Sequence, residues 1–190
     1  MQPDQVLKRG DAVIAVDVQN DFCSGGALAV DGGEEVIPVL NRWLAAAARQ
    51  GVPVVASRDW HPVCHCSFQE QGGPWPPHCI QDTPGAAFHP DLELPARTVR
   101  VSKGTAFDRD AYSAFDDTGL AVYLRQQGVA RLWVGGLARD VCVLETVKSA
   151  CEQGFETHVL IPATRAVDAA SAEQAVHAMR AAGAIIESHA

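Results

Sequence analysis

The chain has 190 residues, 47% of them hydrophobic and 20% charged, which is enough to bury the core of a single globular domain spanning residues 1–190. Its formal net charge of -8 argues against nucleic acid or an anionic membrane surface as a partner. No apolar run approaches the roughly 18 residues of a membrane helix, and no amino-terminal stretch resembles a signal peptide. We therefore expect a cytoplasmic protein whose six cysteines are free thiols or metal ligands.

Short apolar segments alternate with amphipathic segments along the chain. We expect strands at residues 12–17, 53–57, 98–102, 132–136, 157–161 and 184–187. Helical patterns cover residues 34–49, 119–127, 141–153 and 171–182. Because the strands are nearly all apolar rather than alternating, both of their faces should be covered. The predicted fold is an α/β three-layer sandwich, in which helices lie on both faces of a six-stranded parallel sheet.

One long segment, residues 59–95, has neither pattern and is rich in proline, glycine and histidine. A segment of this length without secondary structure of its own is usually functional in a compact domain. We therefore expect it to carry part of a functional site.

Reactive side chains stand at or just beyond the carboxyl ends of the first four predicted strands. In strand order they are Asp17, Asp59, Lys103 and Cys142. In an open parallel sheet, ligands bind in the crevice beyond the carboxyl ends of the strands. The four side chains are therefore expected to point into one place.

Cys142 lies where the fourth strand, which ends in two glycines, passes into the first turn of a helix. Unpaired backbone N–H groups and the positive end of the helix dipole favour an anion there, so we expect the thiol to be biased toward thiolate. Taken singly, each residue has a simpler explanation: Cys142 as a small buried hydrophobe, Asp17 as a turn cap and Lys103 as a solvated lysine.

Together, a carboxylate, an amine and a thiol are the groups that thiol-based acyl transfer requires. Asp17 can accept the thiol proton and return it to the leaving group, and the ammonium of Lys103 can lower the pKa of the Cys142 thiol. No G-x-S-x-G sequence occurs, so a serine hydrolase is not indicated. The pattern predicts a cysteine nucleophile.

The 59–95 segment contains a second group of residues with possible chemical roles. Asp59 and His61 alternate along an extended chain and can face one side, and His78 can return to complete a carboxylate and two imidazoles. That set suits a divalent transition metal with open positions for water or substrate. A competing interpretation is a closed structural zinc site made by a histidine with Cys64, Cys66 and Cys79. In a third, the histidines only form hydrogen bonds within the loop.

These pieces resemble the nicotinamidase/pyrazinamidase branch of the isochorismatase-like cysteine hydrolases. The resemblance covers nearly the whole chain, and the metal loop is its most specific part. It is carried by DVQNDFCSGGAL (17–28), DWHPVCHCSF (59–68), GGPWPPHC (72–79), KGTAFDRDAYSAF (103–115) and GGLARDVCV (135–143).

The resemblance implies a six-stranded parallel sheet flanked by helices and a homo-oligomeric assembly. It also implies a catalytic triad and a metal site with three protein ligands. The triad falls on Asp17, Lys103 and Cys142, and the metal ligands on Asp59, His61 and His78. Zinc is the metal we expect first, with iron or manganese as the other possibilities.

The implied reaction hydrolyses nicotinamide, or a related pyridine carboxamide such as pyrazinamide, to the acid and ammonia through a cysteine thioester. Backbone N–H groups of Ala138 and Cys142 would hold the oxyanion, next to a cis peptide bond between Leu137 and Ala138. The metal would bind the pyridine nitrogen and orient the ring. The positions that line the ring pocket fall on Phe22, Trp75 and Tyr112, each of which is otherwise ordinary core packing.

Some positions depart from the family pattern. Arg139 stands where threonine is common, Pro162 where an acidic residue often ends the fifth strand, and Cys64 where asparagine is frequent. Arg139 would either raise the thiolate content of the nucleophile or face solvent. A fourth metal ligand, if one exists, falls on Ser67 or His65.

Two other functions remain open from the sequence. A sister amidase acting on an N-carbamoyl or ureide compound would share the three triad residues but would not need the carboxylate and two imidazoles. A non-catalytic metal-binding or interaction protein on the same fold is the alternative from another class, since a fold does not imply an activity.

Overall fold

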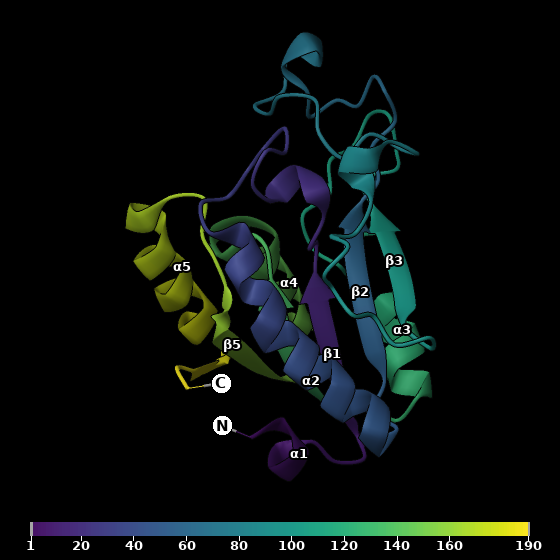
Figure 1. Cartoon of the computed structure of the whole chain (residues 1–190), viewed down its shortest axis with the longest axis vertical. Coiled ribbons are helices and arrows are strands. Elements are labelled where there is room, and N and C mark those ends of the chain that lie inside the picture. Colours follow the sequence, from purple (N-terminus) through teal and green to yellow (C-terminus); the bar gives the residue numbers. More distant parts are fainter. Residues whose placement is uncertain (1, 190) are drawn as a thin grey trace.

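The computed structural model describes residues 2–189, and its centre is a six-stranded, fully parallel sheet in the order β3-β2-β1-β4-β5-β6 (Figure 1). The strands are β1 (Asp11–Val16), β2 (Val54–Asp59), β3 (Val99–Lys103), β4 (Arg131–Gly136), β5 (Glu156–Thr164) and β6 (Ile185–Glu187). The helices are α1 (Pro3–Val6), α2 (Ile37–Gln50), α3 (Leu120–Gln126), α4 (Leu144–Glu152) and α5 (Ala169–Ala181).

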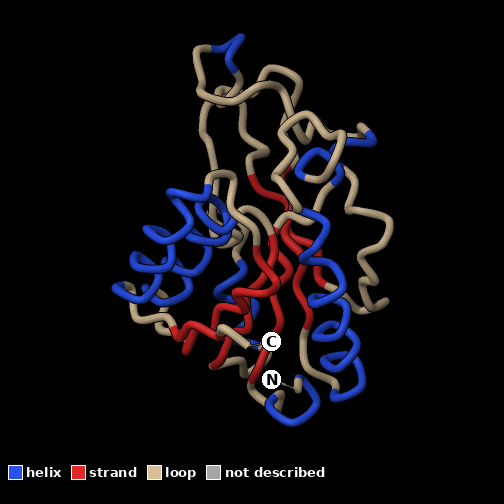
Figure 2. Tube along the Cα trace, turned by 60° about the vertical axis from the view of Figure 1, so that its left-hand side comes forward, coloured by secondary structure: helices blue, strands red, loops and turns tan. Residues whose placement is uncertain are grey.

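Helices cover both faces of the sheet, and the pleat of β1 shows which face each layer covers. Val13 and Ala15 of β1 belong to a core shared with α2, whereas Ile14 and Val16 belong to a second core shared with α3, α4 and α5. Figure 2 shows the strands enclosed between helices on either side. The predicted three-layer α/β sandwich is confirmed.

The fifth strand is longer than predicted, because it continues past Pro162 to Thr164. Its register against β4 shifts between the pairs Val134↔Val159 and Gly136↔Thr164, and Pro162 lies in the unpaired stretch between them. Proline has no N–H to donate, so a sheet tolerates it at such an irregularity. The prediction that the strand ends at residue 161 is therefore wrong.

The strand β3 was expected to be buried on both faces, and it is not. It pairs only with β2, Arg100 is exposed, and Val99 and Val101 are half-buried. Its place at the sheet edge explains this, since no further strand or helix covers it fully.

Residues 59–95 contain no α-helix, and their helical turns are the short 3₁₀ turns Gln69–Gln71 and Pro84–Ala86. This segment forms much of the loop cap at the carboxyl ends of the strands, at the end of the molecule opposite the chain termini (Figure 1). Within residues 2–189, no helix has both the length and the apolar character needed to cross a membrane.

Candidate active site

The sheet order places a topological switch point between β1 and β4. The chain runs from β1 outward to β2 and β3, and then returns to pair β4 with the other side of β1. Crevices at such points are the usual ligand sites of open parallel sheets. Asp17 follows β1 and Cys142 lies in the turn after β4, while Asp59 and Lys103 end β2 and β3. The structure thus brings the four predicted side chains to one edge of the sheet.

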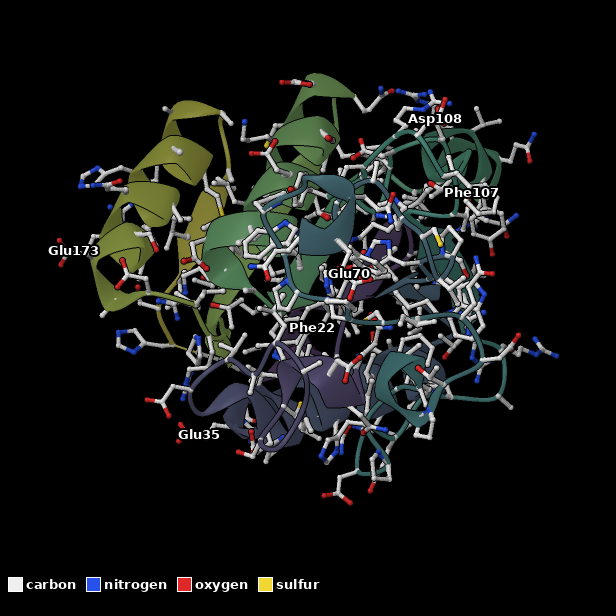
Figure 3. All side chains as sticks on the ribbon, turned by 90° about the horizontal axis from the view of Figure 1, so that it is seen from above. Phe22, Glu35, Glu70, Phe107, Asp108 and Glu173 are labelled. Carbon is white, nitrogen blue, oxygen red and sulfur yellow. The ribbon has the colours of Figure 1, made fainter. Side chains whose placement is uncertain are left out.

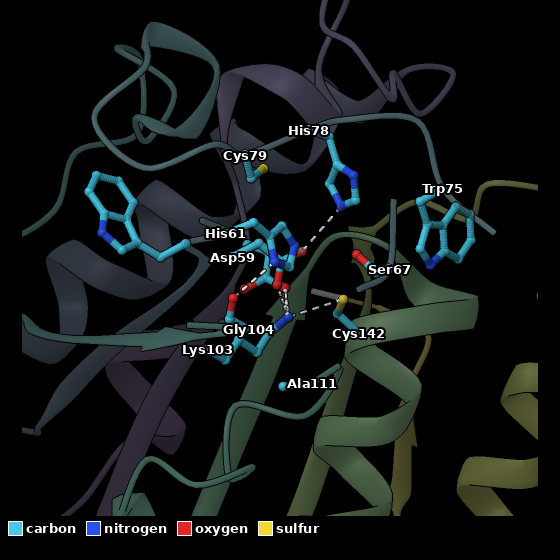
Figure 4. A network of polar contacts seen from close by, with 12 residues as sticks. Asp59, His61, Ser67, Trp75, His78, Cys79, Lys103, Gly104, Ala111 and Cys142 are labelled. Atoms are coloured by element: carbon cyan, nitrogen blue, oxygen red, sulfur yellow. Dashed lines mark hydrogen bonds and ion pairs between the residues drawn. The ribbon is translucent and has the colours of Figure 1, made fainter. Parts of the chain in front are cut away.

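The ammonium of Lys103 is the centre of this cluster (Figure 4). Its Nζ lies 2.8 Å from Asp17 Oδ2, 2.5 Å from Asp59 Oδ1 and 3.4 Å from Cys142 Sγ, and the lysine side chain is fully buried. Burial by itself would lower the pKa of Lys103, but the charges of Asp17 and Asp59 raise it well above the usual value. The lysine is therefore a permanent buried cation rather than a proton shuttle.

Asp17 has the surroundings of a general base. Its Oδ1 accepts a hydrogen bond of 2.6 Å from the Ser57 hydroxyl, whereas no donor is aligned in hydrogen-bond geometry with Oδ2 despite its ion-pair contact with Lys103. Ligand atoms of Asp17, Asp59 and Cys142 lie within 4.8 Å of one another. Burial, assisted by the charge of Asp59, raises the pKa of Asp17, although Lys103 and Ser57 lower it. The carboxylate is thus a stronger base than usual and has a lone pair near the thiol.

Cys142 lies in a π-helical turn, Arg139–Val143, that leads directly into α4. We expected the helix end to lower the pKa of this thiol, and that expectation is wrong. Burial raises the pKa of Cys142 well above its usual value, and the negative charges of Asp17 and Asp59 add to the rise, while Lys103 opposes it. A helix terminus contributes only about 0.3–1 kcal/mol, which burial of the thiolate outweighs. The thiol therefore needs a base.

The turn before Cys142 contains the expected cis peptide bond between Leu137 and Ala138. The carbonyl of Ala138 accepts from the N–H groups of Val141 and Val143, whereas no described group accepts from the Ala138 N–H. Ala138 and Cys142 both line the cavity at this edge of the sheet. The Ala138 N–H is therefore available to a ligand.

Asp59, His61 and His78 form a compact, buried group that could hold a metal ion, with candidate ligand atoms within 4.8 Å of one another. The Nε2 atoms of His61 and His78 lie 3.6 Å and 3.8 Å from Asp59 Oδ2. The Nδ1 atom of each ring faces a backbone carbonyl, that of Gly104 at 3.1 Å and that of Pro76 at 2.8 Å.

These carbonyls fix the tautomers, because a carbonyl can only accept and Nδ1 must then carry the proton. Both Nε2 lone pairs are left facing the carboxylate of Asp59, which is the arrangement that metal-binding histidines usually show. Gly104 makes this possible for His61, since a Cβ there would lie 2.5 Å from the imidazole and the residue has a φ of +63°. The donor set therefore fits a divalent transition metal.

The closed zinc site of three cysteines is not assembled. Cys64 is exposed and Cys79 is buried, and neither they nor Cys66 join any metal-ligand cluster among residues 2–189. The third interpretation, hydrogen bonding within the loops, describes His65. Its Nδ1 lies 2.7 Å from the Ser67 hydroxyl and its Nε2 lies 3.2 Å from the Arg109 carbonyl.

Phe22, Trp75 and Tyr112 all line the same cavity as Cys142 and the metal-ligand set. Trp75 Nε1 donates a hydrogen bond of 3.0 Å to the Tyr112 hydroxyl, so the two aromatic walls are joined. In Figure 3, which looks onto the carboxyl edge of the sheet, Phe22 lies near the centre of this end and Phe107 near its rim. The cavity thus has aromatic surface as well as Cys142 and the side chains of Asp59, His61 and His78.

Arg139 behaves in neither of the two ways expected. Its guanidinium donates to the Thr164 hydroxyl and to the carbonyls of Ile161 and Thr164, so it links the turn that contains Cys142 to the end of β5. Ser57 was missed by the sequence reasoning. A polar residue two positions before Asp59, on the same face of an otherwise apolar strand, was the signal that could have found it.

Comparison with known proteins decides the family. The isochorismatase domain matches residues 11–190. The chain belongs to the isochorismatase family. Within it, a nicotinamidase/pyrazinamidase of Mycobacterium tuberculosis is 42% identical over 179 residues, covering 90% of this chain and 95% of that protein.

Solved structures of the isochorismatase fold agree with this assignment. The pyrazinamidase of Pyrococcus horikoshii in complex with zinc has a TM-score of 0.91 and 42% identity, covering 95% of this chain and 99% of that one. PnC1 of L. infantum in complex with nicotinate has a TM-score of 0.87 and 38% identity, covering 94% and 92%.

Proposed function

We propose that the protein is a metal-dependent amidase that hydrolyses nicotinamide to nicotinate and ammonia, and that it accepts related pyridine carboxamides such as pyrazinamide. The observation that supports the proposal most strongly is that Asp59 belongs both to the cluster around Lys103 and Cys142 and to the group of possible metal ligands. Asp59 contacts Lys103 through Oδ1 and faces both imidazoles through Oδ2, so the thiol chemistry and the metal-ligand set share one residue. The similarity to a nicotinamidase/pyrazinamidase and to the nicotinate-bound PnC1 supports this substrate class.

In the first step, Asp17 takes the proton of Cys142, and the thiolate attacks the carboxamide carbon. A carbon–sulfur bond forms while the carbonyl electron pair moves to oxygen. The backbone N–H groups of Ala138 and Cys142 would hold this oxyanion, and preorganised donors of this kind contribute about 3 kcal/mol each. Lys103, at 3.4 Å from the sulfur, balances the charge that the thiolate carries.

In the second step, Asp17 returns the proton to the departing nitrogen, and the carbon–nitrogen bond breaks to release ammonia and leave a thioester. Water then attacks the thioester carbon while Asp17 accepts its proton. Collapse of the second tetrahedral intermediate releases the acid, and the proton returns to the thiol. Asp17 therefore serves as base and acid in turn, which suits a carboxyl group whose pKa is raised.

The metal ligands we propose are Asp59, His61 and His78, and zinc is the ion we expect there, with iron or manganese as alternatives. When bound, a divalent ion at this set supplies a Lewis-acid site for a heterocyclic nitrogen and so orients the ring. Phe22, Trp75 and Tyr112 supply the aromatic walls of the ring pocket. The similarity to a zinc-bound pyrazinamidase supports the choice of zinc.

The test is ammonia release from nicotinamide by the wild type, by Cys142→Ala and by metal-stripped wild type with zinc, iron or manganese added back. We expect turnover to be lost in the variant and lost reversibly on stripping. Cys151→Ala, which removes a half-buried thiol on α4, is the matched control and should stay active. No turnover with any metal, in folded protein that binds metal, would refute the proposal and favour an N-carbamoyl or ureide substrate.

Two further features belong to the proposal. All six cysteines are free in the structure, which is in keeping with a reducing cytoplasm as the place of action. The relationship to the family also leads us to propose a homo-oligomer, and the mass measured by light scattering after gel filtration tests it. A monomer mass at micromolar concentration would contradict it.

A further inference from the structure

We propose that Gln19 and Asp21 are positioning residues that fix the backbones of the two chain segments bearing the metal ligands Asp59 and His78. This inference rests on the metal site of the proposed function. It concerns the stretch DVQND at residues 17–21, in the loop that follows β1.

The Gln19 amide holds both backbone polar groups of Asp59. Its Nε2 donates to the Asp59 carbonyl at 2.8 Å and to the Ala86 carbonyl at 2.9 Å, and its Oε1 accepts from the Asp59 N–H at 2.8 Å. The side chain is completely buried. All of these groups would be buried polar atoms without partners if the amide were absent, at a cost of about 1–3 kcal/mol each.

The sheet itself explains why Asp59 needs such a partner. The ladder between β1 and β2 ends at the pair Val16↔Ser57, because the chain leaves the sheet at Asp17, where φ is +47°. Asp59 lies two residues beyond this end and pairs only with Lys103 of β3 on its other side. The Gln19 side chain therefore takes the place of one residue of the missing strand.

Asp21 fixes the segment of His78 in a similar way. Its Oδ2 accepts from the Cys79 N–H at 2.7 Å, and its Oδ1 accepts from the Ala27 N–H at 3.2 Å. The neighbouring Phe22 ring lies 5.6 Å from the His78 imidazole, measured between centroids. Asp21 thus fixes the backbone at Cys79, the residue after His78, while the Pro76 carbonyl holds Nδ1 of the His78 ring.

Asp17, Gln19 and Asp21, three alternate residues of one short stretch, therefore have related roles. Asp17 is the proposed base, Gln19 holds the carboxylate ligand, and Asp21 holds a histidine ligand. Because all three belong to one segment, the spacing between the base and the metal site is set by five residues of local backbone. Loss of the Gln19 amide should leave the ligands present but Asp59 less well fixed, so the folded protein should bind metal more weakly.

The experiment measures zinc affinity by competition with a chromophoric chelator, and the visible spectrum of bound Co²⁺, in Gln19→Met and wild type. Loss of a partner that orients a metal ligand typically weakens metal binding about 10- to 100-fold, and we expect that range with an altered Co²⁺ spectrum. The matched control is Asn20→Ala. Asn20 Nδ2 donates to the Pro84 carbonyl of the same 84–86 turn but contacts no proposed ligand, so its zinc affinity should stay close to that of wild type.

Urea unfolding of the metal-free variants shows whether each one is folded. If Gln19→Met does not fold, Asp21→Asn decides instead, with an expected loss of about tenfold in zinc affinity and an altered Co²⁺ spectrum. A folded Gln19→Met protein with wild-type zinc affinity and Co²⁺ spectrum overturns the inference, as does a wild type that binds neither ion. A wild type that binds zinc but leaves nicotinamide intact refutes the proposed function alone, because metal affinity is read without any substrate.

Discussion

Replacing Lys103 by methionine tests the charge balance of the buried cluster most directly. Methionine has a similar length but no charge, and the structure has two carboxylates that contact the lysine Nζ, Asp17 at 2.8 Å and Asp59 at 2.5 Å. Asp17 has a raised pKa and can take up a proton at modest cost, whereas the pKa of Asp59 is well below the usual value. The variant is therefore left with one uncompensated buried charge.

Removal of one partner from a buried ion pair costs about 3–5 kcal/mol, so we expect Lys103→Met to lose that much of its free energy of unfolding. A typical domain has about 5–15 kcal/mol in total, which means that the variant should be weakened but measurable. Turnover should fall to background as well, because the thiolate loses the cation at 3.4 Å.

The assay is urea unfolding of the metal-stripped protein, followed by fluorescence, beside ammonia release by the zinc-loaded form. Lys148→Met is the matched control, since Lys148 pairs with Glu145 on the surface, with side chains 39% and 38% exposed. Such a pair contributes under about 1 kcal/mol. If Lys103→Met were no less stable than this control, the cluster would not depend on the lysine charge and the reasoning would fail.

Three further changes test other contacts. Ser57→Ala removes a hydrogen bond that lowers the pKa of Asp17, so that pKa should rise further. Because Asp17 must be ionised to act as base, the acid limb of kcat/KM should move to higher pH in zinc-saturated enzyme, and an unmoved limb would exclude Asp17 as its origin. Trp75→Phe removes the donor to Tyr112 and should raise KM for nicotinamide roughly fivefold with kcat little changed, as for the loss of about 1 kcal/mol, whereas a kcat defect at constant KM would contradict the pocket assignment. Asp11→Asn weakens hydrogen bonds from Arg131 and Trp133 at the opposite end of the sheet, and it should cost about 1.5–3 kcal/mol in urea unfolding with kcat/KM unchanged.

The layers of the fold and the edge that carries the site could be predicted from the sequence because they depend on local pattern. Apolar runs mark buried strands, and the carboxyl ends of parallel strands must share one edge. The sequence placed Asp59 at the same edge as Lys103 and with the two imidazoles. The direct ion pair between Asp59 and Lys103 could not be predicted, since it depends on β2 and β3 being neighbours in the sheet. The continuation of β5 past Pro162 could not be predicted either, because it depends on a register shift against β4 that the residue pattern does not indicate.

The Cys142 thiol shows most clearly where local reasoning fails. From the sequence, the nearest charged feature is the end of a helix, and that alone favours the thiolate. In the folded protein the sulfur is buried and two carboxylates lie close to it, so the direction of the pKa change reverses. Arg139 likewise is three residues from Cys142 in sequence, yet its guanidinium binds the end of β5.

A raised pKa on both the thiol and its base is compatible with catalysis, because proton transfer depends on the difference between the two values. Burial raises the pKa of Asp17 and of Cys142 together, so much of its cost cancels when the proton moves from one to the other. The transfer leaves the total charge of the cluster unchanged and shifts one negative charge from oxygen to sulfur, and both atoms lie near the same ammonium, at 2.8 Å and 3.4 Å. Lys103 therefore stabilises the cluster before and after the transfer, and the raised pKa of the thiol does not by itself prevent the transfer.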